Sequence, residues 1–408
     1  MKQMIIVAVM AATLTTAWGQ VTTSPYSKQG FGLLNDNASG IQRQMGGVGY
    51  AMQNGRAINV MNPASYSQVD SLTFLWDVGL DLNNSWSKEG NKKGHNFGGG
   101  LDYLTAHFRL ANHVGGSFGL VPYSSVGYTY EGDIEDGSEA RIGSGGLSQL
   151  YVGAGYEPFK GFSIGANVSY LFGTITNTNS IEASSLTTYQ RVMEVRDWNI
   201  NLGVQYAAQL TQRDRLVLGF AWTPRKSMHG HAWGAIMDSQ DTKTDTIGYT
   251  SMKGNYEQPN SFGAGLSFNH DNRWVAEVDF TYQNWKKAKY APIEGFESLT
   301  SSFDNRWKAA AGLQFTPNRR GSYVGAMAFR MGAFYNHDYQ NIAGNNVRDY
   351  GATIGVGLPV PAGKTTINLG LEWRHRTSSP AVMITEDYLN VTLSVNFNEL
   401  WFWKNKIR

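Results

Sequence analysis

The strongest constraint on the fold is an alternation of apolar and polar residues that recurs to the end of the chain. Successive side chains of a β-strand point to opposite faces of a sheet, whereas a helix would mix the two sets on each face. The alternation runs through 198–206, 274–283, 367–374 and 389–397. These segments are therefore predicted to be strands with one apolar face and one polar face.

Counting all such segments gives about fourteen, with ends uncertain by about two to four residues. They cover 72–82, 101–110, 114–129, 146–157, 162–175, 194–208, 215–223, 258–269, 273–284, 305–315, 324–336, 348–358, 364–376 and 386–397. The gaps between them alternate in length. Long gaps such as 83–100, 130–145, 176–193 and 224–257 follow the odd segments, and short gaps such as 111–113 and 270–272 follow the even ones. Outer-membrane barrels alternate long outer loops with short periplasmic turns in this way.

We therefore predict an all-β fold, a transmembrane antiparallel β-barrel of about fourteen strands over 71–397, in the outer membrane of a Gram-negative cell. An even strand number places both termini on the same side of the membrane, and we expect this to be the periplasmic side. The composition agrees, because 47 Gly, 21 Tyr, 19 Phe and 12 Trp accompany only 16% charged residues and a mean hydropathy of −0.34. Barrels in lipid carry aromatic girdles at both interfaces. The Trp-rich and Lys-rich residues 398–408 are expected to form a periplasmic tail.

The first residues predict export. Lys2 precedes an apolar stretch that ends at Leu14, and Ala17 and Gly19 fit the small-residue positions of a signal-peptide cleavage site, so residues 1–19 are predicted to be removed. The apolar stretch is shorter than the about 20 residues of a membrane-spanning helix. The chain has no Cys, which excludes disulfides, a thiolate metal site and a lipidated N-terminus. A formal charge of +2 gives no reason to expect nucleic acid as a partner.

Residues 20–70 carry many glycines but no alternation. Their apolar residues are too sparse to build a separate core, so we expect this segment to fold into the barrel lumen as a plug. A disordered leader remains an alternative, because Gly and Asn content does not separate the two.

A family resemblance appears here. The run Met45–Ala51, followed by Asn62-Pro63-Ala64 just before the first strand, resembles the N-terminal hatch of FadL/TodX-type outer-membrane transporters of hydrophobic compounds. Weaker similarities at Pro259–Gly263 and 274–285 extend the resemblance over most of the chain. It implies a divergent FadL-like barrel that takes up apolar compounds passively. The plug residues it implies are Gly46, Gly47, Gly49, Asn62, Pro63 and Ala64.

Pro122 interrupts the third predicted strand. Proline cannot donate to a strand ladder, so a hydrogen bond is missing there and the strand should bend. In the FadL/TodX family a comparable kink is proposed as a lateral exit for apolar cargo. The resemblance therefore implies a lateral gate, and a bulge tolerated in an ordinary strand is the alternative. The gate residues are Pro122, Tyr123, Ser124, Ser125 and Gly127.

Charged residues of both signs fall on the predicted lumenal face. They are expected to form a polar network that joins the wall to the plug, which argues against an open, charge-selective pore. A solvated channel wall is the alternative. The residues are Asp77, Asp81, Arg109, Glu277, Asp279, Arg330, Glu372 and Arg374.

No enzymatic or metal chemistry is indicated. His229 and His231 lack a third ligand at a fixed spacing, and no Ser, His and Asp cluster suggests a phospholipase. We predict no cofactor and no catalytic site. The predicted function is passive uptake of hydrophobic, fatty-acid-like small molecules through plug rearrangement. The alternative is a non-transporting FadL-like subunit of an outer-membrane secretion or assembly complex. Outer-loop aromatics would serve either role: Trp233, Tyr249, Tyr256 and Trp285.

Overall fold

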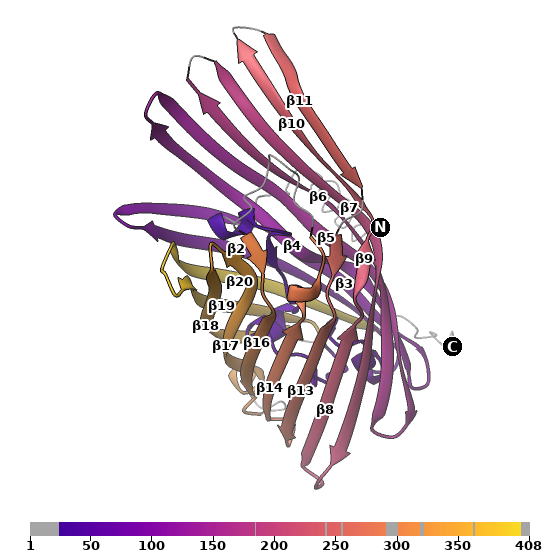
Figure 1. Ribbon diagram of the computed structural model, residues 1–408. Coiled ribbons are helices and arrows are strands. Elements are labelled where there is room, and N and C mark those ends of the chain that lie inside the picture. Colours follow the sequence, from indigo (N-terminus) through magenta and orange to yellow (C-terminus); the bar gives the residue numbers. More distant parts are fainter. Residues whose placement is uncertain are drawn as a thin grey trace, which may run out of the picture.

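The computed structural model describes residues 24–183, 185–240, 243–253, 256–290, 301–318, 322–361 and 364–400, and these form a closed antiparallel barrel (Figure 1). Each wall strand pairs with its neighbours in sequence order, and the first closes the ring against the last. The fourteen wall strands are β2 (Thr73–Glu89), β3 (Lys92–Ala111), β4 (Val114–Ile134), β5 (Gly137–Phe159), β6 (Phe162–Glu182), β7 (Leu186–Gln209), β8 (Asp214–Thr223), β13 (Ser261–His270), β14 (Trp274–Gln283), β16 (Arg306–Phe315), β17 (Ala328–Ile342), β18 (Asn345–Pro359), β19 (Thr366–Ser379) and β20 (Thr385–Leu400). The prediction of a barrel of about fourteen strands is confirmed.

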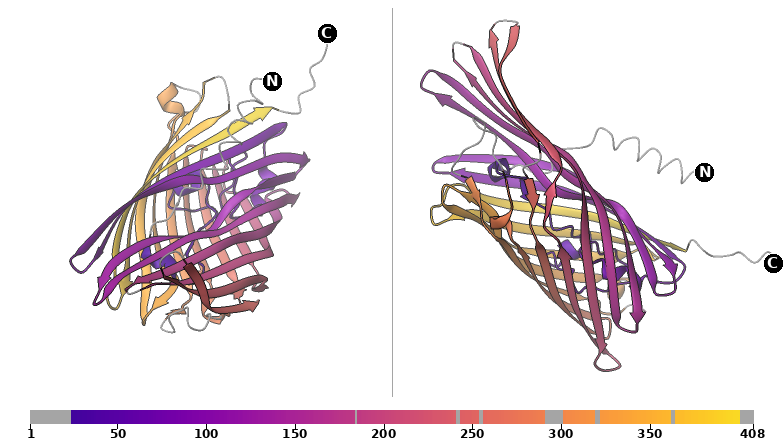
Figure 2. Two further views of the ribbon diagram at one scale, coloured as in Figure 1. Left: turned by 90° about the horizontal axis from the view of Figure 1, so that it is seen from above. Right: turned by 45° about the vertical axis from the view of Figure 1, so that its right-hand side comes forward.

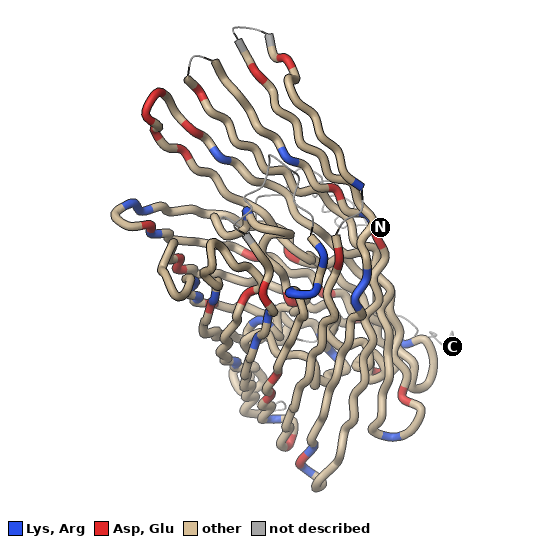
Figure 3. Tube along the Cα trace, viewed as in Figure 1, with Lys and Arg blue, Asp and Glu red and all other residues tan. Residues whose placement is uncertain are grey.

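The alternation of residue types becomes an apolar exterior and a polar interior. Leu82, Val391, Leu371 and Ile354 stand opposite one another on four neighbouring strands and are 37–56% exposed. Their neighbours along the strands point inward and are polar residues or glycines, and Asp81, Thr353 and Thr392 among them are buried. Figure 3 shows long stretches of strand without charged residues. No helix within the described residues is long and apolar enough to cross a membrane.

The predicted outer loops are largely wrong, because the strands continue through them. β5 has 23 residues and β7 has 24, so 83–100, 130–145 and 176–193 form tight hairpins instead of loops. The region 224–257 holds β9 (Lys226–Met228), β10 (Gly230–Gln240), β11 (Lys243–Lys253) and the first residues of β12 (Tyr256–Gln258). Outside lipid both faces of a strand can be polar, so these extensions carry no alternation that sequence reading could detect.

The extensions build a sheet that stands beyond the rest of the wall. β10 takes the place of β8 beside the first half of β7, and β11 pairs with β10. One end of the barrel carries the long hairpins and is here called the long-hairpin end, and the other carries the short turns and is called the short-turn end. Strands β4 to β7 with β10 and β11 rise together at the long-hairpin end (Figures 1 and 2). Elsewhere, β15 (Ser301–Phe303) pairs with β17, and α3 (Tyr323–Ala326) occupies the predicted start of β17.

Residues 24–72, here called the N-terminal segment, lie inside the ring of strands (Figure 2, left). The segment contains η1 (Pro25–Lys28), β1 (Leu33–Leu34), α2 (Gly40–Arg43) and η2 (Pro63–Gln68). Ser24 contacts Glu386 at the long-hairpin end, whereas the Tyr66 carbonyl contacts His107 near the short turns. The segment therefore runs the length of the lumen before it enters β2.

Several predictions about the chain ends are not tested. The signal peptide lies outside the described residues, as does the tail from 401 onward, while residues 398–400 still belong to β20. Ser24 lies at the long-hairpin end and Leu400 at the short-turn end. The periplasmic position of both termini stays a prediction.

Candidate functional site: the N-terminal segment and the wall it contacts

The Asn-Pro-Ala element begins η2 and packs against glycines of the wall. The Asn62 side chain caps η2 by accepting from the Ala64 amide (3.2 Å), and Pro63 occupies the first helical position, where no amide donor is needed. A Cβ atom at wall residue Gly165 would lie 2.4 Å from the Pro63 carbonyl carbon, and one at Gly203 would lie 2.1 Å from Asn62 Oδ1. The lumenal glycines therefore make room for the N-terminal segment.

Asn62 also ties the segment together. Its side-chain amide donates to the Tyr50 carbonyl (2.7 Å) and to the wall carbonyl of Val204 (3.2 Å). Asn62 and Ala64 are both fully buried. A single side chain thus joins η2, β7 and residues 45–51, here called the Gly-rich run.

The Gly-rich run is held by wall side chains through its backbone amides. Gly46 and Gly47 adopt φ values of +77° and +83°. Residues with a Cβ atom rarely adopt these values, so glycine is favoured at both positions. The Gly46 amide donates to Thr353 Oγ1 (2.9 Å), the Gly49 amide to Asp279 (2.6 Å) and the Ala51 amide to Glu277 (3.0 Å). Two acids predicted to join the wall to the plug therefore contact predicted plug residues.

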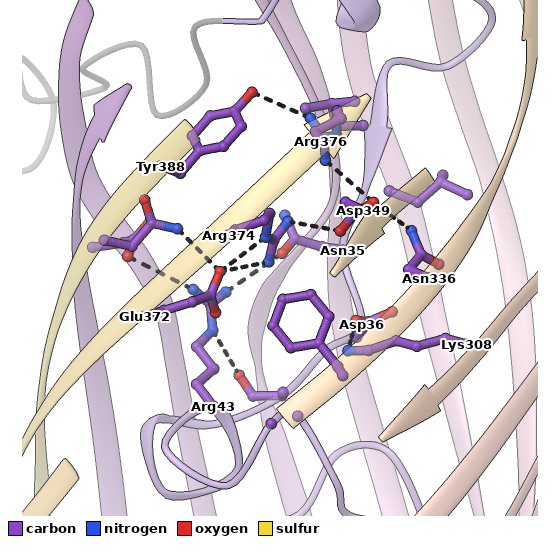
Figure 4. A pocket seen from close by; sticks show the side chains of 18 of the residues that line it. Asn35, Asp36, Arg43, Lys308, Asn336, Asp349, Glu372, Arg374, Arg376 and Tyr388 are labelled. Atoms are coloured by element: carbon purple, nitrogen blue, oxygen red, sulfur yellow. Dashed lines mark hydrogen bonds and ion pairs between the residues drawn. The ribbon is translucent and has the colours of Figure 1, made fainter. Parts of the chain in front are cut away.

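A charged cavity of about 120 Å³ lies above the Gly-rich run (Figure 4). Asp36 of the N-terminal segment pairs with Arg306 and Lys308 of β16, each at 2.6 Å. Arg43 pairs with Asp102 of β3 at 2.8 Å. Burial opposes the ionisation of Asp36, but the two cations outweigh it and hold the pKa of the carboxyl well below its usual value.

The remaining predicted network residues divide between lumen and rim. Arg330 donates to Gln44 of the N-terminal segment (2.7 Å), and Arg374 pairs with Glu372 (2.7 Å) on the cavity wall. Asp77 accepts from Tyr103 (3.1 Å), and Asp81 lies 3.9 Å from Arg43. Arg109 instead contacts Ser71 and Asn112 at the short-turn rim.

Sequence reading missed Asp36, Arg43 and Arg306, which carry the shortest ion pairs between segment and wall. Asp36 and Arg306 are 270 positions apart, and residues 20–70 have no periodicity that would assign a face to any side chain. For Asp36 an acidic residue among asparagines was the only signal, whereas Arg306 lies in the predicted strand 305–315, where alternation places it on the same face as Lys308.

The predicted gate residues lie where the N-terminal segment pairs with the wall. The register of β4 against β5 shifts between Pro122 and Ser124, so Tyr123 is an extra residue in β4. β1 pairs with Ser124 and Ser125, the Asn35 amide donates to the Tyr123 carbonyl (2.9 Å), and the Ser24 amide donates to the Gly127 carbonyl (2.7 Å). The gate function itself stays a prediction.

An aromatic cluster closes the lumen toward the long hairpins. Phe31 of the N-terminal segment is fully buried between Tyr256, Trp285 and Tyr290, with ring centroids 5.6–6.0 Å away. Tyr256 and Trp285 are thus core residues and not exposed loop aromatics as predicted. Trp233 and Tyr249 stack on the outer hairpin at 6.1 Å. A second, polar cavity of about 100 Å³ is lined by Asn35, Asp36 and Tyr50 of the N-terminal segment and by wall residues that include Gln149, Asn199 and Gln283.

Comparison with known proteins supports this fold. A family model described as BamG matches residues 1–408. No curated protein matches the sequence. The toluene transporter TbuX of Ralstonia pickettii has a TM-score of 0.63 at 16% identity, covering 89% of this chain and 99% of that chain. The toluene transporter TodX of P. putida has a TM-score of 0.61 at 15% identity, covering 90% and 99%. A Pseudomonas aeruginosa FadL homologue has a TM-score of 0.65 at 11% identity, also covering 90% and 99%. The predicted resemblance to FadL/TodX-type barrels is confirmed.

Proposed function

The chain belongs to the BamG family, and from this premise we propose that it is a non-transporting FadL-like subunit of an outer-membrane assembly or secretion complex. The single observation that carries the proposal is the filled lumen. The N-terminal segment runs through the whole lumen, is fixed to several wall strands and closes it with an aromatic cluster.

The lumenal cavities do not suit apolar cargo. They hold about 120 and 100 Å³, whereas ligand pockets usually measure about 300–1,000 Å³ and are mostly apolar. Arg43, Lys308, Glu372 and Arg374 line the larger one. An acyl chain placed there would displace water from these ion pairs and offer them no hydrogen bond in return, which is unfavourable.

The outer surface of the barrel supports both an outer-membrane location and the proposed role in a complex. The apolar outward face of the strands suits the outer membrane, and no enzymatic role is proposed. The outward apolar residues of the wall strands form a band around the barrel, here called the apolar belt. The raised sheet of β4 to β7, β10 and β11 offers a large surface beyond this belt on which other subunits can pack.

The test is the state of the protein in its native membrane. Outer membranes solubilised in mild detergent are expected to release the chain in one stoichiometric complex on a native gel, and depletion of the chain should leave uptake of toluene and of long-chain fatty acids unchanged. A monomer with detergent or lipid bound in the lumen, or loss of uptake on depletion, would contradict the proposal.

Uptake of hydrophobic compounds is the second candidate. It is favoured by the break at Pro122 and by the fold shared with TbuX and TodX, which are named toluene transporters. Under this candidate, Pro122→Ala should restore a backbone donor, straighten β4 and lower uptake several-fold in a barrel that still folds. Unchanged uptake of each compound tested would exclude the gate.

A further inference from the structure

The wall carries a seam between β3 and β4. β3 pairs with β2 from Phe108 to Lys92, but it pairs with β4 only between Leu104 and Ala111. β4 pairs with β5 along its whole length. Above Leu104, β3 and β4 therefore each turn one edge to the seam, and no ladder between the described residues joins these edges. Figures 1 and 2 show the β2–β3 hairpin diverging from the sheet that begins with β4.

The free edge of β3 from Phe97 to Leu101 lies beside apolar outward residues of the wall. Gly99 stands opposite Leu82, and the register continues through Val391 and Leu371 to Ile354, all outward and apolar. Phe97, on the same face of β3, is 69% exposed. Backbone N–H and C=O groups without partners cost several kcal/mol each in hydrocarbon, so the part of the edge from Phe97 to Leu101 requires a partner.

The N-terminal segment satisfies the opposite edge only. β1 pairs with Ser124 and Ser125 of β4, and Ser24 pairs with Gly127, so this side of the seam already accepts extended backbone. On β3 the segment offers side-chain contacts instead. Arg43 binds Asp102, and the Gly40 amide donates to the Tyr103 hydroxyl, so the segment backs the seam from inside without pairing with the β3 backbone.

We propose that the free edge of β3, from Lys92 to Leu101, binds an extended strand of another outer-membrane protein. A strand adds to a sheet edge through alternating main-chain donors and acceptors, which an acyl chain or an apolar solute cannot supply. Ten residues offer an edge of about 33 Å. Three consecutive glycines, Gly98, Gly99 and Gly100, place no side chain on either face of this edge, so the partner's side chains can pack closely against it. Phe97 adds an outward apolar contact. The inference rests on the proposed role in a complex and names the contact surface.

The test uses a photoreactive benzoylphenylalanine at His95, Phe97 or Leu101, which share one face of β3. After irradiation of intact outer membranes, each variant should cross-link to one stretch of one other protein. The cross-linked site should move by two residues between the probes at 95 and 97 and by four between 97 and 101. Probes at Leu371 and Ile354, on paired strands, are matched controls that should give no such register.

Other patterns overturn the proposal: cross-links to lipid only, to this chain or a second copy of it, or to protein sites without that spacing. If a stoichiometric complex is isolated but the register is absent, the seam inference fails and the proposed function stands. If no complex is isolated, the proposed function fails, and the cross-links in intact membranes still decide the seam inference, because the register supports it and the absence of the register overturns it.

A proline pair provides a second measurement. Adjacent amides of a strand point to opposite edges, so one of Asn96→Pro and Phe97→Pro removes a donor to β2 and the other removes a donor to the seam. The variant that keeps the heat-resistant folded band should lose at least tenfold of the cross-link from a probe at Leu101. An unchanged yield in that variant would contradict strand addition.

Discussion

Asp36 is the residue that most directly fixes the N-terminal segment in the lumen. Its carboxylate lies between two cations of β16, and these are themselves less than a tenth exposed. Asp36→Asn would leave both cations buried with a weaker acceptor, and we expect a loss of about 2 to 3 kcal/mol in the free energy of unfolding. Urea-induced unfolding in detergent measures this loss of unfolding free energy. Asp70→Asn, at the exposed pair with Arg56, is the control and should cost less than about 1 kcal/mol.

The same carboxylate gives a pH dependence with a defined sign. Its pKa is lowered in the folded state, so its stabilising contribution is present above the ordinary Asp value of about 3.9 and is lost as pH falls through the folded pKa. The stability difference between the native protein and Asp36→Asn should be constant from about pH 5 to pH 8 and shrink below about pH 4. A difference that grows on acidification would contradict the assigned ion pairs.

Wall glycines provide a test of packing at residue scale. A Cβ at Gly165 would come within 2.4 Å of Pro63, and backbone cannot yield as a flexible side chain can. Gly165→Ala should therefore destabilise the barrel by about 1–3 kcal/mol. Gly132→Ala, on β4 where nothing lies within 4 Å of the added atom, should be neutral or slightly stabilising in the same unfolding assay. Equal effects of the two changes would exclude the packing explanation.

At the scale of elements, the pairing of β1 with β4 is the feature that sequence reading did not foresee. Strand prediction relies on alternation, and two residues are too short to show any. The bend at Pro122 was foreseen, because a proline without a donor forces a break wherever the strand lies. What fills the break depends on a segment about 90 residues away in the chain.

The β1 pairing can be trapped covalently. The chain has no native Cys, so Leu34→Cys combined with Ser124→Cys, at directly opposed positions, should form a disulfide and shift the band on a non-reducing gel. Leu34→Cys with Thr129→Cys is the control, since five further residues along β4 place the thiols about 16 Å apart. Equal cross-linking of both pairs would show that the N-terminal segment moves freely.

On the scale of the whole molecule, a filled lumen predicts an electrically silent barrel. The N-terminal segment occupies the lumen from the long hairpins to the short turns. In planar bilayers the purified protein should show no steady conductance above the lipid baseline. A stable open level in the native chain would contradict a permanently filled lumen and revive the channel candidate.

The sequence alone determined the barrel, its strand number and its polar interior, because lipid outside and polar groups inside impose a two-residue period on every wall strand. It also located Pro122 and Asn62-Pro63-Ala64, whose backbone preferences are local. Only the tertiary structure decided that Asp36 meets Arg306, that lumenal glycines face η2 and that the outer strands continue beyond the belt. These features depend on contacts between distant residues, or on strands with water on both faces, and neither leaves a period in the sequence.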